Sequence, residues 1–156
     1  MPRGTQLKSD QPKFDVCNCL ALRQATRHVT QFYDRFLASS GLRTTQFSIL
    51  IRLRLAGPMS INALAKSLVM DRTTLGRNIL PLERDGLIEI VPDPADGRSK
   101  VVRLTEAGAA RLRAARAGWT QAQKEFEAAF GGTRAARLRD LLQAVTATEL
   151  AAAAGG

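Results

Sequence analysis

Polar side chains that can donate or accept hydrogen bonds gather within residues 72–78, at spacings that place them on one side of a helix. They are Arg72, Thr73, Arg77 and Asn78. The other side carries an apolar stripe of Leu75, Ile79 and Leu82, which would lie in a core. The polar groups can then bind only a partner outside that core. Base edges and phosphates of DNA are suitable partners for such side chains.

A second basic group follows in the segment PDPADGRSK, where Pro, Asp and Gly supply turn geometry. The turn joins two apolar runs rich in Ile and Val, 87–91 and 101–104, which predicts a hairpin. Arg98 and Lys100 fall at its tip, and Arg103 falls on the returning strand. An arginine on a thin two-stranded loop can enter the minor groove. Asp96 is placed to hold the Arg98 guanidinium through a charge-assisted bond.

Two short helices joined by a tight turn must position the first polar group. Ser60 is placed to N-cap the first helix, and Asp71 to N-cap the second. Apolar residues recur at helical spacing in the first helix, at Ile61, Leu64, Ala65 and Leu68. Gly86 is a natural C′ residue that ends the second helix. The pattern predicts a helix-turn-helix whose second helix fits the major groove.

Each feature has an ordinary explanation when it is taken singly. A basic hairpin tip is commonly just a solvated turn, and a polar helix face is commonly just exposed to water. The two features together, in this order and with an N-cap at each helix start, favour recognition of DNA.

The same residues resemble the MarR-type winged helix-turn-helix regulators. The carrying motifs are LAKSL at 64–68, DRTTLGRN at 71–78, LERDGLIE at 82–89 and DPADGRSKVVRLTEAG at 93–108. The resemblance extends from about Val16 to Leu150 and implies an obligate homodimer that binds pseudo-palindromic promoter DNA. It also implies repression that a small molecule or an oxidant relieves. The predicted DNA contacts are Ser60, Arg72, Thr73, Thr74, Arg77, Asn78, Asp96, Arg98, Ser99 and Lys100.

Two positions depart from what the resemblance implies. Gly97 stands where that family often has an arginine, so one charge of the wing is missing and a lower DNA affinity is implied. Pro81 lies inside the second helix and removes the amide bond to the Arg77 carbonyl. We therefore expect a local kink or a loosened last turn.

Composition suits one domain, or a compact DNA-binding unit with an attached dimerisation unit, in 156 residues. The hydrophobic content of 45% is ordinary for a globular protein, and the net charge of +9 favours a polyanionic partner. No apolar run approaches the roughly 20 residues that span a bilayer. The first 13 residues lack the apolar core of a signal peptide, so we expect a cytoplasmic protein without membrane contact.

The remaining segments predict long helices around the DNA-binding unit. One covers 14–37 and ends at Ser39-Ser40-Gly41, and the next begins with Thr44 or Thr45 as its cap and ends at Gly57-Pro58. Thr105 opens a long helix that Gly131-Gly132 breaks, and Thr133 is placed to cap the last helix. Their apolar stripes are too broad for one chain to cover, which favours a homodimer.

The predicted fold is mainly α-helical with a small β-hairpin wing: a winged helix-turn-helix with long N- and C-terminal dimerisation helices. Residues 43–104 are the expected DNA-binding domain, and 16–42 with 105–150 the expected dimerisation region. Residues 1–15 are expected to form a flexible tail, and 151–156 a frayed one.

Two cysteines, Cys17 and Cys19, begin the first predicted helix. They are either small buried hydrophobes or redox-active thiols, one of which forms an intersubunit disulfide. The helix N-terminus would favour the reactive thiolate. A bridge between the two is disfavoured because residues two apart on a helix point to nearly opposite sides. A zinc site lacks further ligands, since His28 is the only histidine.

An organic effector is the other predicted signal. In the family that the chain resembles, small aromatic molecules bind between the dimerisation helices and the DNA-binding lobe. The corresponding candidates are Arg23, Arg27, His28 and Tyr33, with Trp119 facing them. A cation or imidazole beside aromatic rings suits a carboxylate on a flat ring. The alternative is structural, with Trp119 in a core stripe and His28 a satisfied polar residue at its edge.

Enzyme motifs are missing from the sequence: it contains no GxSxG, Walker loop, HExxH or dinucleotide-binding glycine pattern. We therefore predict a protein that is not an enzyme and needs no cofactor. The alternative function from a neighbouring class is an effector-independent architectural DNA-binding protein, with little dependence on sequence.

Overall fold

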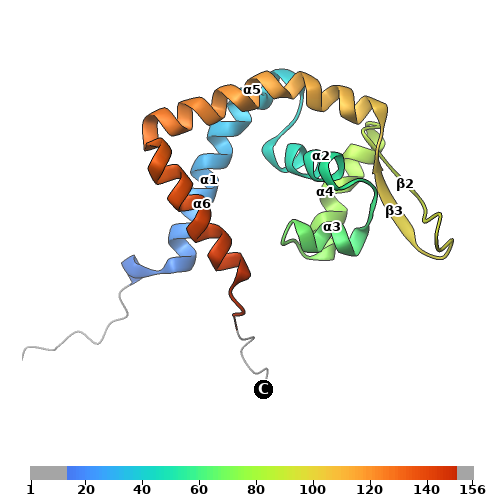
Figure 1. The fold of residues 1–156 in the computed structure, drawn as a ribbon, viewed down its shortest axis with the longest axis horizontal. Coiled ribbons are helices and arrows are strands. Elements are labelled where there is room, and N and C mark those ends of the chain that lie inside the picture. The colour runs from blue at the N-terminus through green and yellow to red at the C-terminus, as the bar shows by residue number, and fades with distance from the viewer. Residues whose placement is uncertain (1–13, 151–156) are drawn as a thin grey trace, which may run out of the picture.

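The computed structural model describes residues 14–150. It is mainly α-helical with one small antiparallel sheet, as predicted (Figure 1). The predicted tails lie outside the described residues, except that Phe14–Val16 forms a short 3₁₀ helix, η1. The other elements are α1 Asn18–Leu37, η2 Ala38–Ser40, α2 Thr44–Ala56, β1 Met59–Ser60, α3 Ile61–Ser67, α4 Arg72–Arg84, β2 Ile88–Pro92, β3 Lys100–Leu104, α5 Glu106–Phe130 and α6 Gly132–Ala147.

Helices α2, α3 and α4 pack with the sheet into one unit, which we call the lobe. Its core is made by the apolar stripes that the sequence predicts for α3 and α4, together with one face of α2 and one of β3. The buried members include Ile49, Leu50, Leu53, Leu64, Ala65, Leu75, Ile79, Leu82 and Val102. Each of these helices packs its apolar face into the core, so the polar face of α4 lies on the surface of the lobe.

The wing is the hairpin β2–β3, and its strands start within one residue of the predicted runs. Glu89 lies opposite Arg103 in the antiparallel register. The sheet has a third strand that the sequence did not predict: β1, only two residues long, pairs with β3 in the order β1-β3-β2. This pairing fixes the start of α3 against the base of the wing.

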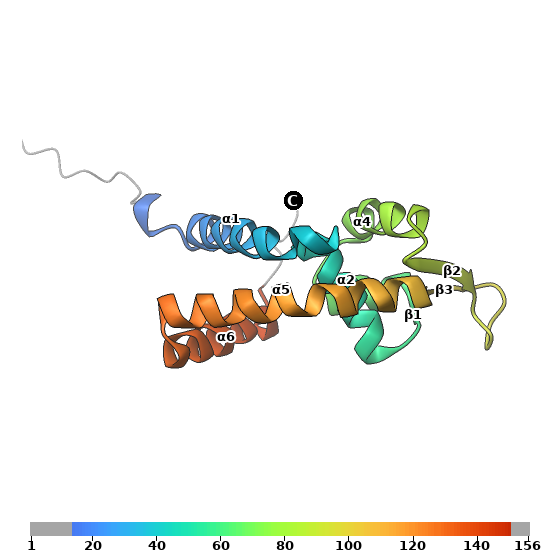
Figure 2. The ribbon, with the colours of Figure 1, turned by 90° about the horizontal axis from the view of Figure 1, so that it is seen from above.

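Helix α5 runs across the top of the lobe and continues beyond it to α1 and α6 (Figure 1). We call α1, α6 and the C-terminal half of α5 the arm. Seen from above, the arm lies at the end of α5 opposite the hairpin (Figure 2). Helices α1 and α5 approach closely at Gly118, where an added Cβ would lie 2.1 Å from the carbonyl oxygen of Phe36. Only glycine allows this contact.

The helix boundaries correct several expectations. Cys17 is the N-cap of α1 with an extended backbone, so that helix begins later than expected. Thr44 is the first residue of α2 and does not cap it. Its amide and hydroxyl instead donate to Asp34 Oδ1, both at 2.7 Å. Thr133 does not cap α6 either, because Gly131 occupies the N-cap position.

Candidate nucleic-acid interface

Asp71 is the N-cap of α4, as predicted, and we call this helix the reading helix. The Asp71 Oδ1 accepts the Thr74 amide at 2.7 Å. Its Oδ2 accepts the Thr74 hydroxyl, also at 2.7 Å. The hydroxyl bond, followed by the backbone bonds, holds the pKa of the Asp71 carboxyl below its usual range. Asp71 therefore stays ionised at the helix N-terminus, where a negative charge is favourable.

The polar face of α4 divides into free and occupied groups. Arg72, Thr73 and Arg77 are exposed. Asn78 donates through Nδ2 to the Thr74 carbonyl at 2.8 Å, and the Thr74 hydroxyl is held by Asp71. Ser60, also a predicted contact, uses its hydroxyl to accept the Ala63 amide at 3.1 Å as the N-cap of α3. The groups that remain directed outward are the two arginines and Thr73.

The last turn of α4 is intact, so the expected loosening at Pro81 is wrong. The Asp85 amide donates to the Pro81 carbonyl at 3.0 Å. Gly86, at φ +71°, then donates to Glu83 and is followed by a bond from the Leu87 amide to the Leu82 carbonyl, both at 2.9 Å. These two bonds form a Schellman motif that satisfies the terminal carbonyls.

The tip of the wing is shaped by aspartates. Asp96 accepts the backbone amide of Arg98 at 3.1 Å and the Ser99 hydroxyl at 3.2 Å. The expected bond from Asp96 to the Arg98 guanidinium is not formed, and the Asp96 carboxylate accepts the backbone amide of Arg98 and the Ser99 hydroxyl instead. Asp93 accepts the amide of Ala95 at 2.9 Å. The turn is thus held by the Asp93 and Asp96 carboxylates, and Arg98 and Lys100 are exposed beyond it.

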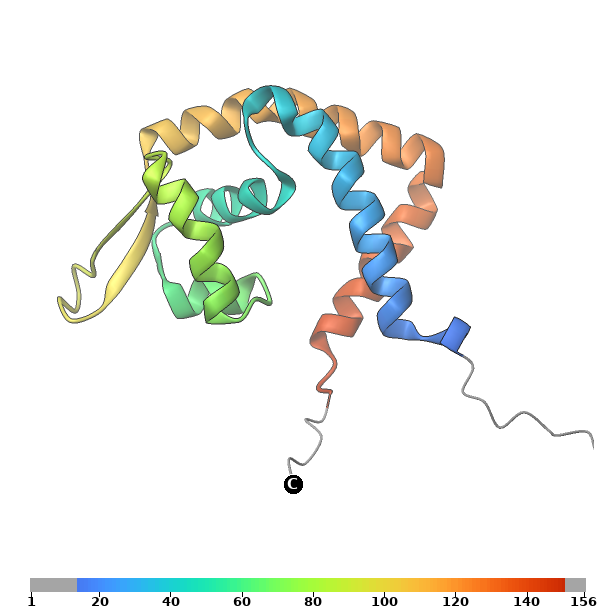
Figure 3. The same ribbon diagram turned by 180° about the vertical axis from the view of Figure 1, so that it is seen from behind.

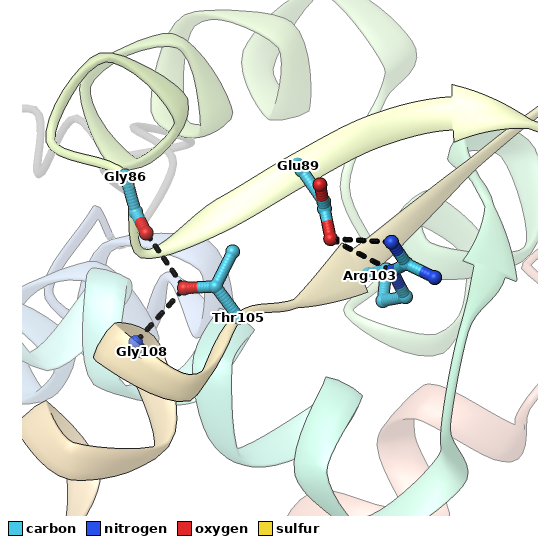
Figure 4. A network of polar contacts seen from close by, with 5 residues as sticks. All are labelled: Gly86, Glu89, Arg103, Thr105 and Gly108. Atoms are coloured by element: carbon cyan, nitrogen blue, oxygen red, sulfur yellow. Dashed lines mark hydrogen bonds and ion pairs between the residues drawn. The ribbon is translucent and has the colours of Figure 1, made fainter.

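Arg103 belongs to the stem of the wing. Its Nη2 lies 2.6 Å and its Nε 2.8 Å from Glu89 Oε1 across the hairpin, so its charge is paired within the wing (Figure 4). Beside this pair, the Thr105 hydroxyl donates to the Gly86 carbonyl at 2.6 Å and accepts the Gly108 amide at 3.0 Å. One hydroxyl therefore joins the end of α4 to the first turn of α5 (Figure 4).

The turn between α3 and α4 contains a residue that the sequence analysis missed. Val69 has a φ of +53° and is the only non-glycine residue with a positive φ within residues 14–150. Its side chain is 74% exposed. A glycine, asparagine or aspartate would have marked this position as left-handed, whereas valine gave no such signal.

The five predicted effector residues do not converge in one protomer. The Tyr33 hydroxyl bonds to Gln123 of α5, and burial raises the Tyr33 pKa. Trp119 does not face this group, because its ring stacks on Phe47 of α2 at a centroid distance of 6.2 Å. The three remaining candidates, Arg23, Arg27 and His28, are exposed on α1.

Both cysteines are exposed, so the alternative that they are small buried hydrophobes is wrong for the protomer. The Cys17 sulfur accepts the Leu20 amide at 3.4 Å as the N-cap of α1. Only Cys19 lies within α1, so the expectation that residues two apart on a helix point to opposite sides does not apply to this pair. Within residues 14–150 no three His, Cys, Asp or Glu side chains are grouped to bind a metal ion. No helix in that range combines the length and the apolarity that crossing a membrane needs.

A reading helix with an outward polar face and a basic wing on one lobe define a winged helix-turn-helix protein. Residues 42–100 match the MarR family. The repressor NicR of Pseudomonas putida is 34% identical over 107 residues, which cover 67% of this chain and 68% of NicR. The chain belongs to the MarR family of transcriptional regulators, and its relatives are regulators rather than enzymes.

Two further relatives show the range of this family. The activatory protein BadR of Rhodopseudomonas palustris is 34% identical over 101 residues, which cover 62% of this chain and 58% of BadR. The regulator MosR of M. tuberculosis, solved in complex with DNA, is 37% identical with a TM-score of 0.73. That match covers 86% of this chain and 99% of MosR.

Proposed function

We propose that the chain is a dimeric repressor that binds a specific operator in double-stranded promoter DNA. One observation carries the proposal: the N-terminal end of α4 and the tip of the wing lie on the same side of the lobe, away from α5 (Figure 3). A single duplex can therefore receive α4 in its major groove and the wing beside it. The DNA complex of MosR and the repressor name of NicR support this assignment.

The two elements make different kinds of contact. Arg72, Thr73 and Arg77 reach base edges, whereas Arg98 and Lys100 bind phosphates or the minor groove, where the potential is most negative. Ser60, Thr74, Asn78, Asp96 and Ser99 shape these elements through their own hydrogen bonds. Residues 43–104 are then the DNA-binding domain. The proposed location of the protein is the cytoplasm.

Binding to the DNA upstream of the protein's own gene tests this function, with a scrambled duplex and a salt series alongside. We expect specific binding with a steep salt dependence, because several phosphates shed counterions. Arg98→Ala should weaken binding to every sequence, whereas Arg77→Ala and Thr73→Ala should relax the preference at particular positions. Arg113→Ala removes one exposed charge from α5 and serves as the control. Equal losses on all sequences for every variant would refute base reading.

Dimerisation through 16–42 and 105–150 is part of the proposal. In the protomer, Leu20 of α1 is 45% exposed, and Leu141 and Val145 of α6 are 65% and 45% exposed. A second copy of the chain would cover these faces and place two reading helices about 34–36 Å apart, one helical turn of DNA. Leu141→Lys should shift the protein to a monomer in light scattering and abolish operator binding. A monomeric wild-type protein would refute the dimer.

The proposed release signal is either thiol oxidation or a small aromatic ligand. In the first case, peroxide oxidises one thiol of each protomer: two S–H bonds are lost, one S–S bond forms, and the peroxide is reduced to water. Exposed Cys17 and Cys19 at the start of α1 are the candidates. Cys17→Ser and Cys19→Ser should be compared for the release of operator DNA by peroxide. If both variants still release it, the thiols are structural and not the redox switch.

In the second case, a ligand would bind between the arm and the lobe. Its contacts would be drawn from Arg23, Arg27, His28, Tyr33 and Trp119, some of them from the partner protomer. Release of operator DNA by aromatic carboxylates, blocked by Tyr33→Phe or Trp119→Ala, would support this site. The competing function is an architectural DNA-binding protein. It predicts equal affinity for operator and scrambled duplexes and no effect of peroxide or of any ligand.

A further inference from the structure

Four of the five residues with positive φ within residues 14–150 are glycines, and the fifth is Val69. A left-handed backbone brings Cβ close to the following carbonyl oxygen, and a branched side chain makes the contact worse. The end of α4 shows the usual solution, because Gly86 occupies the equivalent C′ position there at φ +71°. Val69 is therefore costly to the fold.

The bonds of the turn do not need the valine side chain. The Val69 amide donates to the Lys66 carbonyl at 3.2 Å, and the Met70 amide donates to the Ala65 carbonyl at 2.9 Å. This is the Schellman motif seen again at the end of α4, and glycine is its preferred residue. Both bonds are made by the backbone alone.

Packing does not compensate for the strain either. The Val69 side chain is 74% exposed, whereas its neighbours in the same turn, Leu68 and Met70, are partly buried against the core. Because its side chain is exposed and its backbone is strained, Val69 makes the protomer less stable than glycine would at the same position. The protomer therefore gains nothing from the valine side chain at this position.

Its position supplies a reason. Val69 lies two residues before Asp71, the N-cap of the reading helix, and three before the outward Arg72. In a helix-turn-helix the N-terminal end of the second helix is the part that contacts base edges. The Val69 side chain has no polar atom, so phosphate is excluded as its partner. Duplex DNA offers two apolar surfaces there, the C5-methyl group of thymine and the face of deoxyribose.

We propose that Val69 is a DNA-contact residue of this protein, whose side chain makes an apolar contact with the duplex at the start of the reading helix. The proposal rests on the proposed operator binding. Glycine at this position would make the free protein more stable. The strain at the turn is therefore the cost of presenting the valine methyl groups to DNA.

Val69→Gly and Val69→Asn test the proposal, measured for both thermal unfolding and operator affinity. Glycine and asparagine both tolerate the left-handed backbone and both lack the branched methyl groups. We expect Tm to rise by roughly 2–4 °C for Val69→Gly, while both variants bind the operator about three- to tenfold more weakly. A purely structural residue would move stability and affinity in the same direction.

Operators in which single thymines are replaced by deoxyuridine identify the surface. If the partner is a thymine methyl group, the wild type loses affinity at one or two positions, and the Val69 variants lose nothing further there. If the partner is deoxyribose, the variants bind weakly on every operator and no deoxyuridine matters. Wild-type affinity in both variants would overturn the inference, as would a loss in Val69→Gly alone, which indicates a loosened turn. A wild-type protein without specific binding would overturn the proposed function instead.

Discussion

Substitution of Gly118 by alanine tests how the arm is joined to the rest of the molecule. An added Cβ would lie 2.1 Å from the Phe36 carbonyl oxygen and 3.1 Å from the carbonyl carbon. Carbon and oxygen normally approach to about 3.3–3.6 Å, so α1 and α5 must separate by roughly 1 Å. The contact involves backbone of α1, which cannot turn aside as a flexible side chain can.

The expected magnitude follows from two opposing terms. Overpacking costs about 1–3 kcal/mol, and a Cβ 2.1 Å from a backbone oxygen belongs to the upper part of that range, about 2–3 kcal/mol. The better helix propensity of alanine returns about 1 kcal/mol. We therefore expect Gly118→Ala to lower the free energy of unfolding by roughly 1–2 kcal/mol. For a chain of this length the loss corresponds to a fall in Tm of about 2–8 °C.

Gly76→Ala is the matched control, because Gly76 is also inside a helix and an added Cβ meets no atom within 4 Å. It should raise the free energy of unfolding by about 0.5–1 kcal/mol. Thermal unfolding of both variants must be compared at one protomer concentration, since dimerisation links stability to concentration. If Gly118→Ala is as stable as the wild type while Gly76→Ala behaves as expected, the tight crossing of α1 and α5 is refuted.

Three further substitutions test local features. Asp71→Asn keeps a capping side chain but removes a titrating group whose pKa is lowered by Thr74. As the pH falls below about 4, its unfolding curves should therefore lack the part of the wild type's loss of stability that Asp71 contributes. Tyr33→Phe should cost about 1 kcal/mol by removing the bond to Gln123. Because the Tyr33 pKa is raised on folding, the variant should also be spared the wild type's loss of stability above about pH 10. Gly86→Ala should cost about 1–2 kcal/mol in chemical denaturation, because φ is +71° there and no neighbouring atom is close; an unchanged midpoint would contradict the strain argument used for Val69.

Local signals in the sequence predicted the reading helix well. The stripe of Leu75, Ile79 and Leu82 is buried as its spacing requires, and Ser60 and Asp71 cap the helices they precede. These predictions succeed because both the stripe and the cap depend on residues within one or two turns of each other. The information is contained in the segment itself.

Contacts between distant residues were the source of several errors. Thr44 was expected to cap α2, but Asp34, ten residues earlier in the chain, accepts both its amide and its hydroxyl. Strand β1 exists only because β3 pairs with it. Trp119 meets Phe47 rather than Tyr33, since the choice depends on how α5 crosses α2. Apolar periodicity gives the face of a helix but does not identify what that face contacts.

Helix α5 connects these local and distant contacts into one mechanical unit. Its first turn is bonded through Thr105 to Gly86 at the end of the reading helix, and its middle is packed at Gly118 against the backbone of α1. We therefore expect a change in the packing of α1 on α5 to shift the reading helix without altering any group that faces DNA. In the proposed dimer, two such movements change the spacing of the two reading helices, and a fixed operator spacing penalises that change. In the proposed dimer, an effector can therefore act through the arm without touching α4 or the wing.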